Sequence, residues 1–359
     1  MHGNRILTDR LAIDEPTVPV SVAMATYNGC QHIRRQLDSL AAQSQLPAEL
    51  VVSDDASEDG TVSIIEEFAR TSPFPVLIHR NDARLGYRAN FMRAATLCRS
   101  ELIAFCDQDD FWYQNKIAVS ARPFADPEVL LTYHNADVVA EDGERIGSLA
   151  SRAAAAPILW PLLSKPWLYA LGFTIVFRRS LLRLSDLWPQ SRNIIDSREP
   201  CGHDQWYFFM SRVFGKIAYL KQPLAAYVQH GENAFGWTEN DFLKTLKFNF
   251  CNRSHNTSNQ FEAAKSMAAI LRSVKMDDLP VDWSERADAG VDYYERLSSL
   301  YDLRISLYTS ANLSDRLRTF GKILARNGYA GASSLGCRSF IADLCLGVPI
   351  APLLPRLSD

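Results

Sequence analysis

The sequence predicts an α/β protein in which a mostly parallel sheet carries helices on both faces. Short apolar runs, each typical of a buried strand, alternate with amphipathic helical patterns over residues 20–105. The connections are short enough to favour right-handed strand–helix–strand units. Each run also ends in a polar cluster, and ligands of such sheets bind beyond the carboxyl ends of the strands. Together these observations predict a binding site at one edge of the sheet.

Four strands and three helices account for the first part of the chain. The strands are expected at 20–25, 51–52, 75–78 and 102–105. Apolar residues at helical spacing mark the faces of the intervening helices: Ile33, Leu37 and Leu40; Val62, Ile65 and Phe68; Phe91, Ala95 and Cys98. Later elements are expected as strands at 129–140 and 172–177, a helix from Arg179, an aromatic helix over 205–214 and a strand pair ending near Tyr227.

The patterns divide the chain into three parts. Residues 1–17 are polar and are expected to form a flexible leader. Residues 18–240 form the α/β domain, and residues 241–359 show only helical patterns with basic faces, which we interpret as a separate helical C-terminal region. Residues 150–166, rich in alanine and proline, are expected to form a loop that lines the site.

Charge and cysteine usage argue against a nucleic-acid-binding or secreted protein. The 38 basic and 41 acidic side chains give a net charge of −3, without the basic excess that nucleic-acid binding favours. The seven cysteines are scattered without a C-x-x-C pair, which indicates a reducing compartment. No signal peptide is apparent, and the apolar stretches 158–177 and 340–357 are interrupted by charges and prolines. We expect a cytoplasmic location, with the C-terminal stretch as a candidate for peripheral contact with the inner face of the cytoplasmic membrane.

Three carboxylates, Asp107, Asp109 and Asp110, lie within four residues directly after the strand at 102–105. Like charges crowded at a strand end repel one another, so a compensating charge is expected. A divalent cation suits this position, because hard cations bind carboxylate oxygens and bridge substrate phosphates. An acidic surface turn is the alternative, since Asp-x-Asp triplets are common.

The first polar turn, Thr26-Tyr27-Asn28-Gly29, carries a single glycine. It matches neither the G-x-G-x-x-G of a dinucleotide-binding fold nor the phosphate-binding P-loop. A phosphate at this edge must therefore be bound by a metal ion and side chains rather than by a glycine-rich loop.

Four motifs carry a family resemblance. They are VSVAMATYNG at 20–29, VVSDDASEDG at 51–60, FCDQDDFW at 105–112 and HDQW at 203–206. In these motifs the chain resembles the inverting family-two glycosyltransferases, which have the Rossmann-like GT-A fold. Among them it is most similar to the bacterial rhamnosyltransferase-type enzymes that build surface polysaccharides such as O-antigen and lipopolysaccharide. The resemblance covers residues 18–236 and departs at His203, where many relatives have glutamate.

The resemblance implies transfer of rhamnose or a similar sugar from a dTDP- or UDP-linked donor to a hydroxyl of a growing glycan or lipid-linked glycan. It also implies Mg²⁺ or Mn²⁺, held mainly by Asp109, with Asp107 between the metal and the ribose. His230 is a further candidate ligand, although a lone histidine is as often structural. The donor-binding residues expected are Thr26, Tyr27, Asn28, Asp54, Asp55, Arg84, Asp107 and Gln108.

Asp54 and Asp55 end the second strand, and either could accept the imide N–H of uracil or thymine. Which of the two reads the base stays open. Helix capping is the alternative use of such residues, and we assign capping to Asp59. Arg84 suits a diphosphate contact because a guanidinium group pairs well with phosphate, with a plain surface charge as the alternative.

Asp204 is the candidate catalytic base for the acceptor hydroxyl. It opens an apolar helix, where partial burial raises its proton affinity and the helix N-terminus favours its charged form. An N-cap role for the helix over 205–214 is the alternative, and one aspartate could serve both purposes. His203 is next in line if Asp204 is not the base.

Two other functions compete with glycosyl transfer. A nucleotidyltransferase that makes the sugar nucleotide would need a glycine-rich, basic first turn, which the sequence lacks. A non-catalytic carbohydrate-binding protein has no need for Asp107, Asp109 and Asp204 together. The sequence therefore favours glycosyl transfer, while the sugar, the acceptor, the linkage and the oligomeric state are left undetermined.

Overall fold

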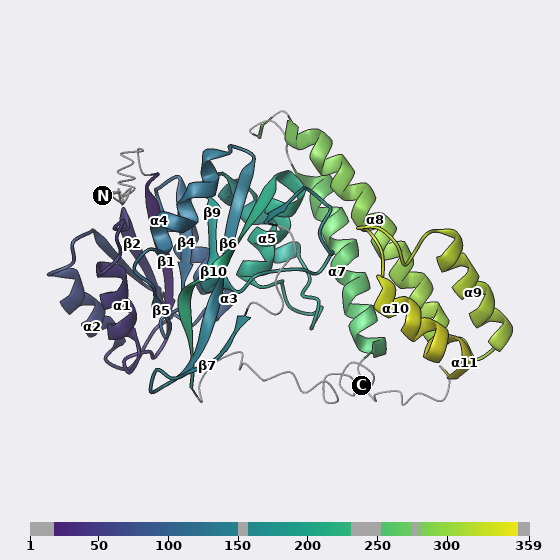
Figure 1. The fold of residues 1–359 in the computed structure, drawn as a ribbon, viewed down its shortest axis with the longest axis horizontal. Coiled ribbons are helices and arrows are strands. Elements are labelled where there is room, and N and C mark those ends of the chain that lie inside the picture. Colours follow the sequence, from purple (N-terminus) through teal and green to yellow (C-terminus); the bar gives the residue numbers. More distant parts are fainter. Residues whose placement is uncertain (1–17, 150–156, 231–252, 275–278, 281, 351–359) are drawn as a thin grey trace, which may run out of the picture.

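The computed structural model describes residues 18–149, 157–230, 253–274, 279–280 and 282–350. One mixed sheet lies between helices, and a group of helices continues from one end of it (Figure 1). The strands are β1 Val20–Thr26, β2 Glu49–Asp54, β3 Val76–Arg80, β4 Leu102–Cys106, β5 Phe111–Trp112, β6 Val129–Ala140, β7 Arg145–Ser148, β8 Ile158–Leu159, β9 Ile175–Arg178 and β10 Lys216–Gln229.

The helices alternate with the strands in the first half and dominate the C-terminal part. They are α1 Ile33–Ala41, α2 Thr61–Ala69, α3 Tyr87–Leu97, α4 Lys116–Ala121, α5 His203–Phe214, α7 Arg253–Ser273, α8 Asp282–Thr309, α9 Leu313–Ala325, α10 Cys337–Ala342 and α11 Val348–Ile350. Three 3₁₀ segments, Arg122–Ala125, Gly172–Thr174 and Arg179–Gln190, and a π-helical turn, Asp343–Gly347, complete the described elements.

The strand order is β3-β2-β1-β4-β9-β6-β10-β5, with β7 paired to β6 and β8 to β10. Strands β1 to β4 are parallel, so the predicted α/β fold is confirmed and its parallel part is this first half. The second half is mixed, because β9 runs antiparallel to both of its neighbours, β4 and β6. Strand β10 then pairs parallel to β6 as one long strand, where the sequence suggested a strand pair.

Side chains that alternate along each strand build two cores, one on each face of the sheet. Val22 and Met24 of β1 point to the face covered by α1, α2 and α4. Ala23 and Ala25 point to the opposite face, where α3 and α5 pack. Because both faces are covered, β1, β2 and β4 are buried at every position, which is why short continuous apolar runs mark them in the sequence.

Helices α7 and α8 extend the second of these cores. Met267 of α7 and Tyr294 of α8 belong to the same buried cluster as α5, and the rings of Phe214 and Trp283 stack at 4.5 Å. The sequence suggested a helical region separate from the sheet. Among the described residues, α9–α11 share a smaller core with Leu300 and Leu307 of α8, around Phe320 and Ile323. The expected domain boundary at residue 240 lies outside the described residues.

Two further expectations concern loops and membrane spans. Of the expected site-lining loop at 150–166, residues 150–156 lie outside the described part, and Ile158–Leu159 forms β8 against β10. Among the helices of the described ranges, none is long and apolar enough to cross a membrane.

Candidate active site

The polar turns that follow β1 to β4 meet at one edge of the sheet, which we call the rim. The amide of Gln108, after β4, accepts a hydrogen bond from the Tyr27 N–H and donates one to the Tyr27 carbonyl, both at 3.0 Å. A Cβ atom at Gly29 would come within 2.3 Å of the Gln108 Oε1, so a larger residue here would displace the Gln108 amide from Tyr27. The single glycine of the first turn therefore admits the Gln108 side chain, and the motifs after β1 and β4 form one unit.

Asp54, at the end of β2, joins the turns that follow β1 and β2 through hydrogen bonds. Its buried carboxylate accepts hydrogen bonds from the hydroxyls of Thr26 and Ser57 at 2.8 and 2.6 Å, and from the Ser57 N–H at 2.9 Å. Asp59 accepts from the Thr61 N–H at 3.0 Å at the start of α2, in agreement with the capping role expected for it. Although burial acts in the opposite direction, hydrogen bonds from Thr61 lower the pKa of Asp59 to about 2.

Asp55 organises the turn after β3. Its carboxylate accepts from the Asn81 side chain at 3.0 Å and from the N–H groups of Leu85 and Gly86 at 2.7 and 2.8 Å. The same turn carries Arg84, whose guanidinium lies over the ring of Tyr27 at 3.9 Å from its centre. The exposed Arg84 is thus held at the rim, beside the turn after β1.

The three carboxylates after β4 have different surroundings. Asp109 Oδ2 lies 2.9 Å from the Nε2 of His230, which follows β10. Asp110 is buried, and its Oδ1 accepts from the Val228 N–H at 3.3 Å while its Oδ2 has no hydrogen-bond partner among the described residues. Burial raises the pKa of Asp107 to about 8, and the charges of Asp109 and Asp204 add to this effect.

Lys116 supplies a compensating charge that the sequence analysis missed. This side chain is fully buried at the start of α4, where its ammonium donates to the Phe173 carbonyl at 2.5 Å and lies 3.6 Å from the ring centre of Trp112. Burial lowers the pKa of Lys116 to about 7, against the opposing charges of Asp110 and Asp107. The available signal was a lysine at position 116 beside the apolar Ile117, on the buried face of the helix after the carboxylates.

Asp204 reaches the same site from α5, which begins at His203 rather than at residue 205. Burial raises the pKa of Asp204 to about 6, while hydrogen bonds from backbone N–H groups, including that of Gln205 at 2.8 Å, act in the opposite direction. The ring of His203, the preceding residue, lies 4.8 Å from that of Phe105 at the end of β4, and the charge of Asp204 raises the pKa of Asp107 in the turn that follows. A carboxylate of this kind is charged at neutral pH and suited to accept a proton.

His203 has a different environment from Asp204. Its ring is buried and stacks on Phe91 at 4.0 Å, with Phe105 edge-on at 4.8 Å. Burial lowers the pKa of His203 to about 3. The residue therefore stays neutral and packs in the core, so the departure from the glutamate of many relatives does not add a charge beside Asp204.

Arg88 is a second residue that sequence reasoning missed. It projects from α3, forms an ion pair with Glu199 at 3.5 Å and favours the charged form of Asp204, so that it lowers the pKa of Asp204. The Arg88 guanidinium also lies 5.1 Å from the ring centre of Tyr87. Only its position in the first turn of α3, directly after the Arg84 turn, could have suggested this role.

The donor set at Asp109 suits a divalent cation only in part. Carboxylate oxygen and imidazole nitrogen face each other there, and the His230 ring stacks on His32 at 4.4 Å, which fixes its orientation. Within residues 18–149, 157–230 and the other described ranges, no three His, Cys, Asp or Glu side chains are grouped as metal ligands. Asp109 and His230 are thus brought together, and Asp107 lies outside that pair.

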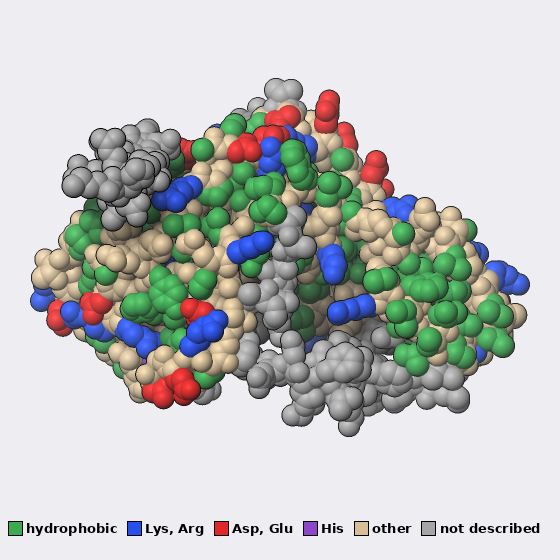
Figure 2. Space-filling view, in the orientation of Figure 1, with side chains coloured by type: hydrophobic (Ala, Val, Ile, Leu, Met, Phe, Trp, Pro, Cys, Tyr) green, Lys and Arg blue, Asp and Glu red, His purple; other side chains and the backbone are tan. Residues whose placement is uncertain are grey.

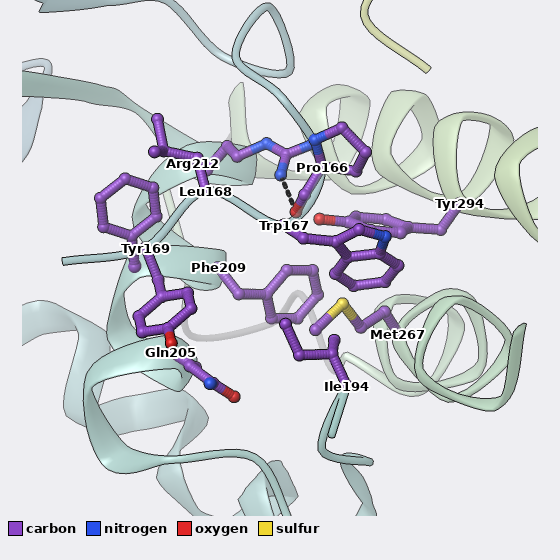
Figure 3. A pocket seen from close by; sticks show the side chains of 11 residues that line it. Pro166, Trp167, Leu168, Tyr169, Ile194, Gln205, Phe209, Arg212, Met267 and Tyr294 are labelled. Carbon is purple, nitrogen blue, oxygen red and sulfur yellow. Dashed lines mark hydrogen bonds between the residues drawn. The ribbon is translucent and has the colours of Figure 1, made fainter. Parts of the chain in front are cut away.

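A cavity lies between α5, which carries Asp204, and the C-terminal helices α7 and α8 (Figure 3). Aromatic and apolar side chains line it, joined by two polar groups: Pro166, Trp167, Leu168, Tyr169, Ile194, Gln205, Phe208, Phe209, Arg212, Met267 and Tyr294. Arg212 donates to the Pro166 carbonyl, and the Trp167 Nε1 donates to the Tyr301 hydroxyl at 2.6 Å. Phe209 of α5 lies edge-on to Tyr294 of α8 at 5.3 Å, so the C-terminal helices pack against the helix that carries the candidate base.

Comparison with known proteins agrees with this geometry. A model of glycosyl transferase family 2 matches residues 21–184. An uncharacterized protein of Mycobacterium tuberculosis is 29% identical over 226 residues, which cover 59% of this chain and 59% of that protein. The dTDP-rhamnosyl transferase RfbG of Shigella flexneri is 27% identical over 232 residues, covering 59% of this chain and 73% of RfbG. The chain thus spans 59% of the length of the mycobacterial relative.

A solved structure shares the fold over a longer range. Staphylococcus aureus TarS 1–349 in complex with UDP superposes with a TM-score of 0.50 and 18% identity, covering 87% of this chain and 92% of TarS 1–349. Identity at this level establishes the fold alone. The chain has the GT-A fold, and its residues 21–184 match the model of glycosyl transferase family 2.

Proposed function

We propose that this chain is an inverting, metal-dependent glycosyltransferase. It moves rhamnose or a similar sugar from a dTDP- or UDP-linked donor to a hydroxyl of a growing bacterial surface glycan. The observation that carries this proposal is the packing of the start of α5 against the end of β4: the ring of His203, next to Asp204, lies 4.8 Å from that of Phe105, and the charge of Asp204 raises the pKa of Asp107. A base and a donor-side acidic cluster in one site are what a single displacement requires. The likeness to a dTDP-rhamnosyl transferase supports this class of sugar.

In the proposed reaction, Asp204 accepts the proton of the acceptor hydroxyl. The acceptor oxygen bonds to the anomeric carbon while the bond from that carbon to the nucleoside diphosphate breaks. Because the attacking oxygen and the leaving group lie on opposite faces of the sugar, the configuration inverts. A carboxylate with a pKa of about 6 is ionised at neutral pH, close to the value that favours general base catalysis.

Asp109 and His230 would hold Mg²⁺ or Mn²⁺, with Asp107 beside them. Such ions commonly take one or two carboxylates and complete their shell with substrate phosphates and water. An ion between Asp109 and His230 would replace the 2.9 Å hydrogen bond that joins them. When bound, the ion stabilises negative charge on the departing diphosphate. Arg84, exposed at the rim, is placed to bind the same diphosphate.

Asp54 or Asp55 would bind the nucleobase imide. Each carboxylate already accepts three hydrogen bonds from the chain, and a carboxylate offers about four acceptor positions. The remaining position is on Asp54 Oδ1, which accepts only from Ser57, or on Asp55 Oδ2, which accepts only from Gly86. The turns formed by Thr26, Tyr27 and Asn28 complete the donor pocket.

A donor screen tests this function. The chain is incubated with dTDP- and UDP-sugars in Mn²⁺, in Mg²⁺ and in EDTA, and the released nucleotide is quantified. We expect slow release of dTDP or UDP in the presence of metal and none in EDTA. Formation of pyrophosphate from a nucleoside triphosphate and a sugar phosphate would instead show a nucleotidyltransferase. Glycan binding without turnover of any donor would show a carbohydrate-binding protein.

A further inference from the structure

The side-chain amide of Gln108 extends the pairing between β1 and β4 into the turns that follow them. The backbones of the two strands pair up to Met24 and Cys106. Two residues after Cys106, the Gln108 Oε1 accepts from the Tyr27 N–H and its Nε2 donates to the Tyr27 carbonyl, both at 3.0 Å. The amide thus takes the place of a backbone peptide where the two strands separate.

These two hydrogen bonds fix the amide in one orientation. A backbone N–H needs an acceptor and a carbonyl needs a donor, so a reversed amide would lose both bonds to Tyr27. Gly29 leaves room for this arrangement, because a Cβ atom there would lie 2.3 Å from the Gln108 Oε1 and 2.7 Å from its Nε2. Gly29 does not have a positive φ, so its backbone would tolerate alanine. What the glycine provides is space for the amide.

The two turns that Gln108 joins carry different halves of the proposed donor site. The nucleotide half contains Tyr27, with the Arg84 guanidinium 3.9 Å from the centre of its ring. The cation half contains Asp109, which directly follows Gln108, and His230, whose Nε2 lies 2.9 Å from the Asp109 Oδ2. Gln108 therefore lies at the junction of the two halves.

Surface charges near the rim provide no comparable link. Helices α1 and α2, which follow β1 and β2, carry basic and acidic side chains that are intermixed at the lower left of Figure 2. Arg34 of α1 pairs with Asp38 at 3.1 Å and with Glu67 of α2 at 3.4 Å. Exposed charges of both signs largely cancel, and salt screens them beyond about 10 Å. The contact between the turns is therefore the direct link between the nucleotide half and the cation half.

We propose that Gln108 is a positioning residue that couples nucleotide binding to cation binding. This inference rests on the proposed function. The amide contacts the chain through both its oxygen and its nitrogen, so we assign it this role rather than direct contact with the donor. By fixing the nucleotide half against the cation half before either ligand arrives, Gln108 lowers the ordering cost of binding a diphosphate that bridges them.

Calorimetric titration of the full chain with UDP and with dTDP, in EDTA and in Mn²⁺, tests the proposal. The ratio of the dissociation constants in EDTA and in Mn²⁺ measures the coupling. Gln108→Met keeps a side chain of similar length but removes both hydrogen bonds to Tyr27. We expect the affinity in EDTA to change by less than about twofold and the ratio to fall by about fivefold or more. An equal loss in EDTA and in Mn²⁺ would indicate direct donor contact, and no loss in either would indicate a purely structural role, so both results would overturn the proposal.

Gly29→Ala is a second test of the same contact. The added methyl group should displace the Gln108 amide, so this variant should lower the ratio as Gln108→Ala does. In the double variant the space is empty, and Gly29→Ala should cause no further loss beyond that of Gln108→Ala. Additive losses would show that Gly29 acts independently of Gln108 and would contradict the proposed contact.

Gln45→Met is the matched control. The Gln45 Nε2 donates to the Val18 carbonyl at 3.1 Å, near the opposite end of β1, so this variant also removes a hydrogen bond between a glutamine and the backbone. It should leave both dissociation constants unchanged, and thermal unfolding checks that each variant is folded. A wild-type chain that binds neither UDP nor dTDP would contradict the proposed function itself. A Mn²⁺ effect on nucleotide binding that is equal in the wild type and in Gln108→Met would contradict only the coupling role.

Discussion

Two regions of this molecule bury charged side chains, and they balance them differently. In the C-terminal helices, Asp343 is matched by Arg304 and receives further hydrogen bonds from Tyr308 and Tyr329. At the rim, Asp107, Asp109 and Asp110 crowd together, and burial raises the pKa of Asp110 well above its usual range. The first arrangement is complete within the chain, whereas at the rim the carboxyl groups outnumber their cationic partners among the described residues, and the raised pKa values keep Asp107 and Asp110 protonated at neutral pH.

The difference indicates which region is structural and which awaits a ligand. A buried pair with every oxygen satisfied holds helices together and leaves nothing to bind. A surplus of carboxylates destabilises the unliganded fold and becomes favourable when a cation or a proton arrives. The buried ammonium of Lys116 lowers the pKa values of Asp107 and Asp110 but does not return them to their usual range. The comparison therefore predicts that substitutions at the rim lower activity, while substitutions in the C-terminal pair lower stability.

The largest expected effect is that of Asp204→Asn. The amide keeps the shape of the side chain and can still accept a backbone hydrogen bond, so fold and nucleotide affinity should persist. Transfer should fall by about 10²–10⁴-fold, because a positioned general base is lost. Steady-state kinetics with the donor found in the screen measures this. In the wild type, the same group should cause activity to decline as pH falls through about 6.

The next effect concerns the C-terminal pair. Asp343→Ala leaves Arg304 buried without its partner and should cost about 3–5 kcal/mol of unfolding free energy. Chemical denaturation of both proteins measures the loss. Replacing the pair together, by Arg304→Met with Asp343→Leu, should restore most of this stability, because no unpaired buried charge remains. A single variant as stable as the wild type would contradict the structural role of the pair.

Asp109→Ala should behave in the opposite way. Transfer should fall by at least about 10²-fold, since one electrostatic contact to developing charge is removed. Stability without metal should be unchanged or higher, because one of the crowded carboxylates is gone. Thermal shift with dTDP or UDP, with and without Mn²⁺, reads both effects. Metal-dependent nucleotide binding that survives in this variant would exclude Asp109 as the metal ligand.

The smallest expected effect on turnover is that of Lys116→Met. Loss of a residue that supports metal ligands typically lowers activity by about 10- to 100-fold. Because the folded-state pKa of Lys116 is lowered to about 7, burying this lysine costs stability most at and below pH 7, and the cost declines toward pH 10.5. The wild type should therefore gain stability relative to the variant as pH rises over that window. Parallel stability curves would contradict the assignment of this pKa.

The sequence by itself determined the features that depend on residues close together in the chain, namely the strands, the helices and the turns between them. Short continuous apolar runs and helical spacing predicted the strands and helices from β1 to β4, because a strand covered on both faces needs apolar residues throughout and a helix buried on one face leaves a period in the chain. The strands are parallel with short connections, so the polar turns after them had to share one edge. For that reason Gln108 and Tyr27, which follow different strands, come into contact. The family motifs could be recognised from their order along the chain.

Only the tertiary structure decided which distant residues share an environment. Lys116 compensates the carboxylates because tertiary packing buries its ammonium against the Trp112 ring and the Phe173 carbonyl, and β9 lies between β4 and β6 in the opposite direction. Helices α7 and α8 belong to the same core as α5, the helix that carries Asp204. Their sequences show that one face is apolar but not which element packs against it. The spacing of apolar residues predicts that a side chain is buried. Which element covers that side chain is determined by contacts between segments far apart in the chain.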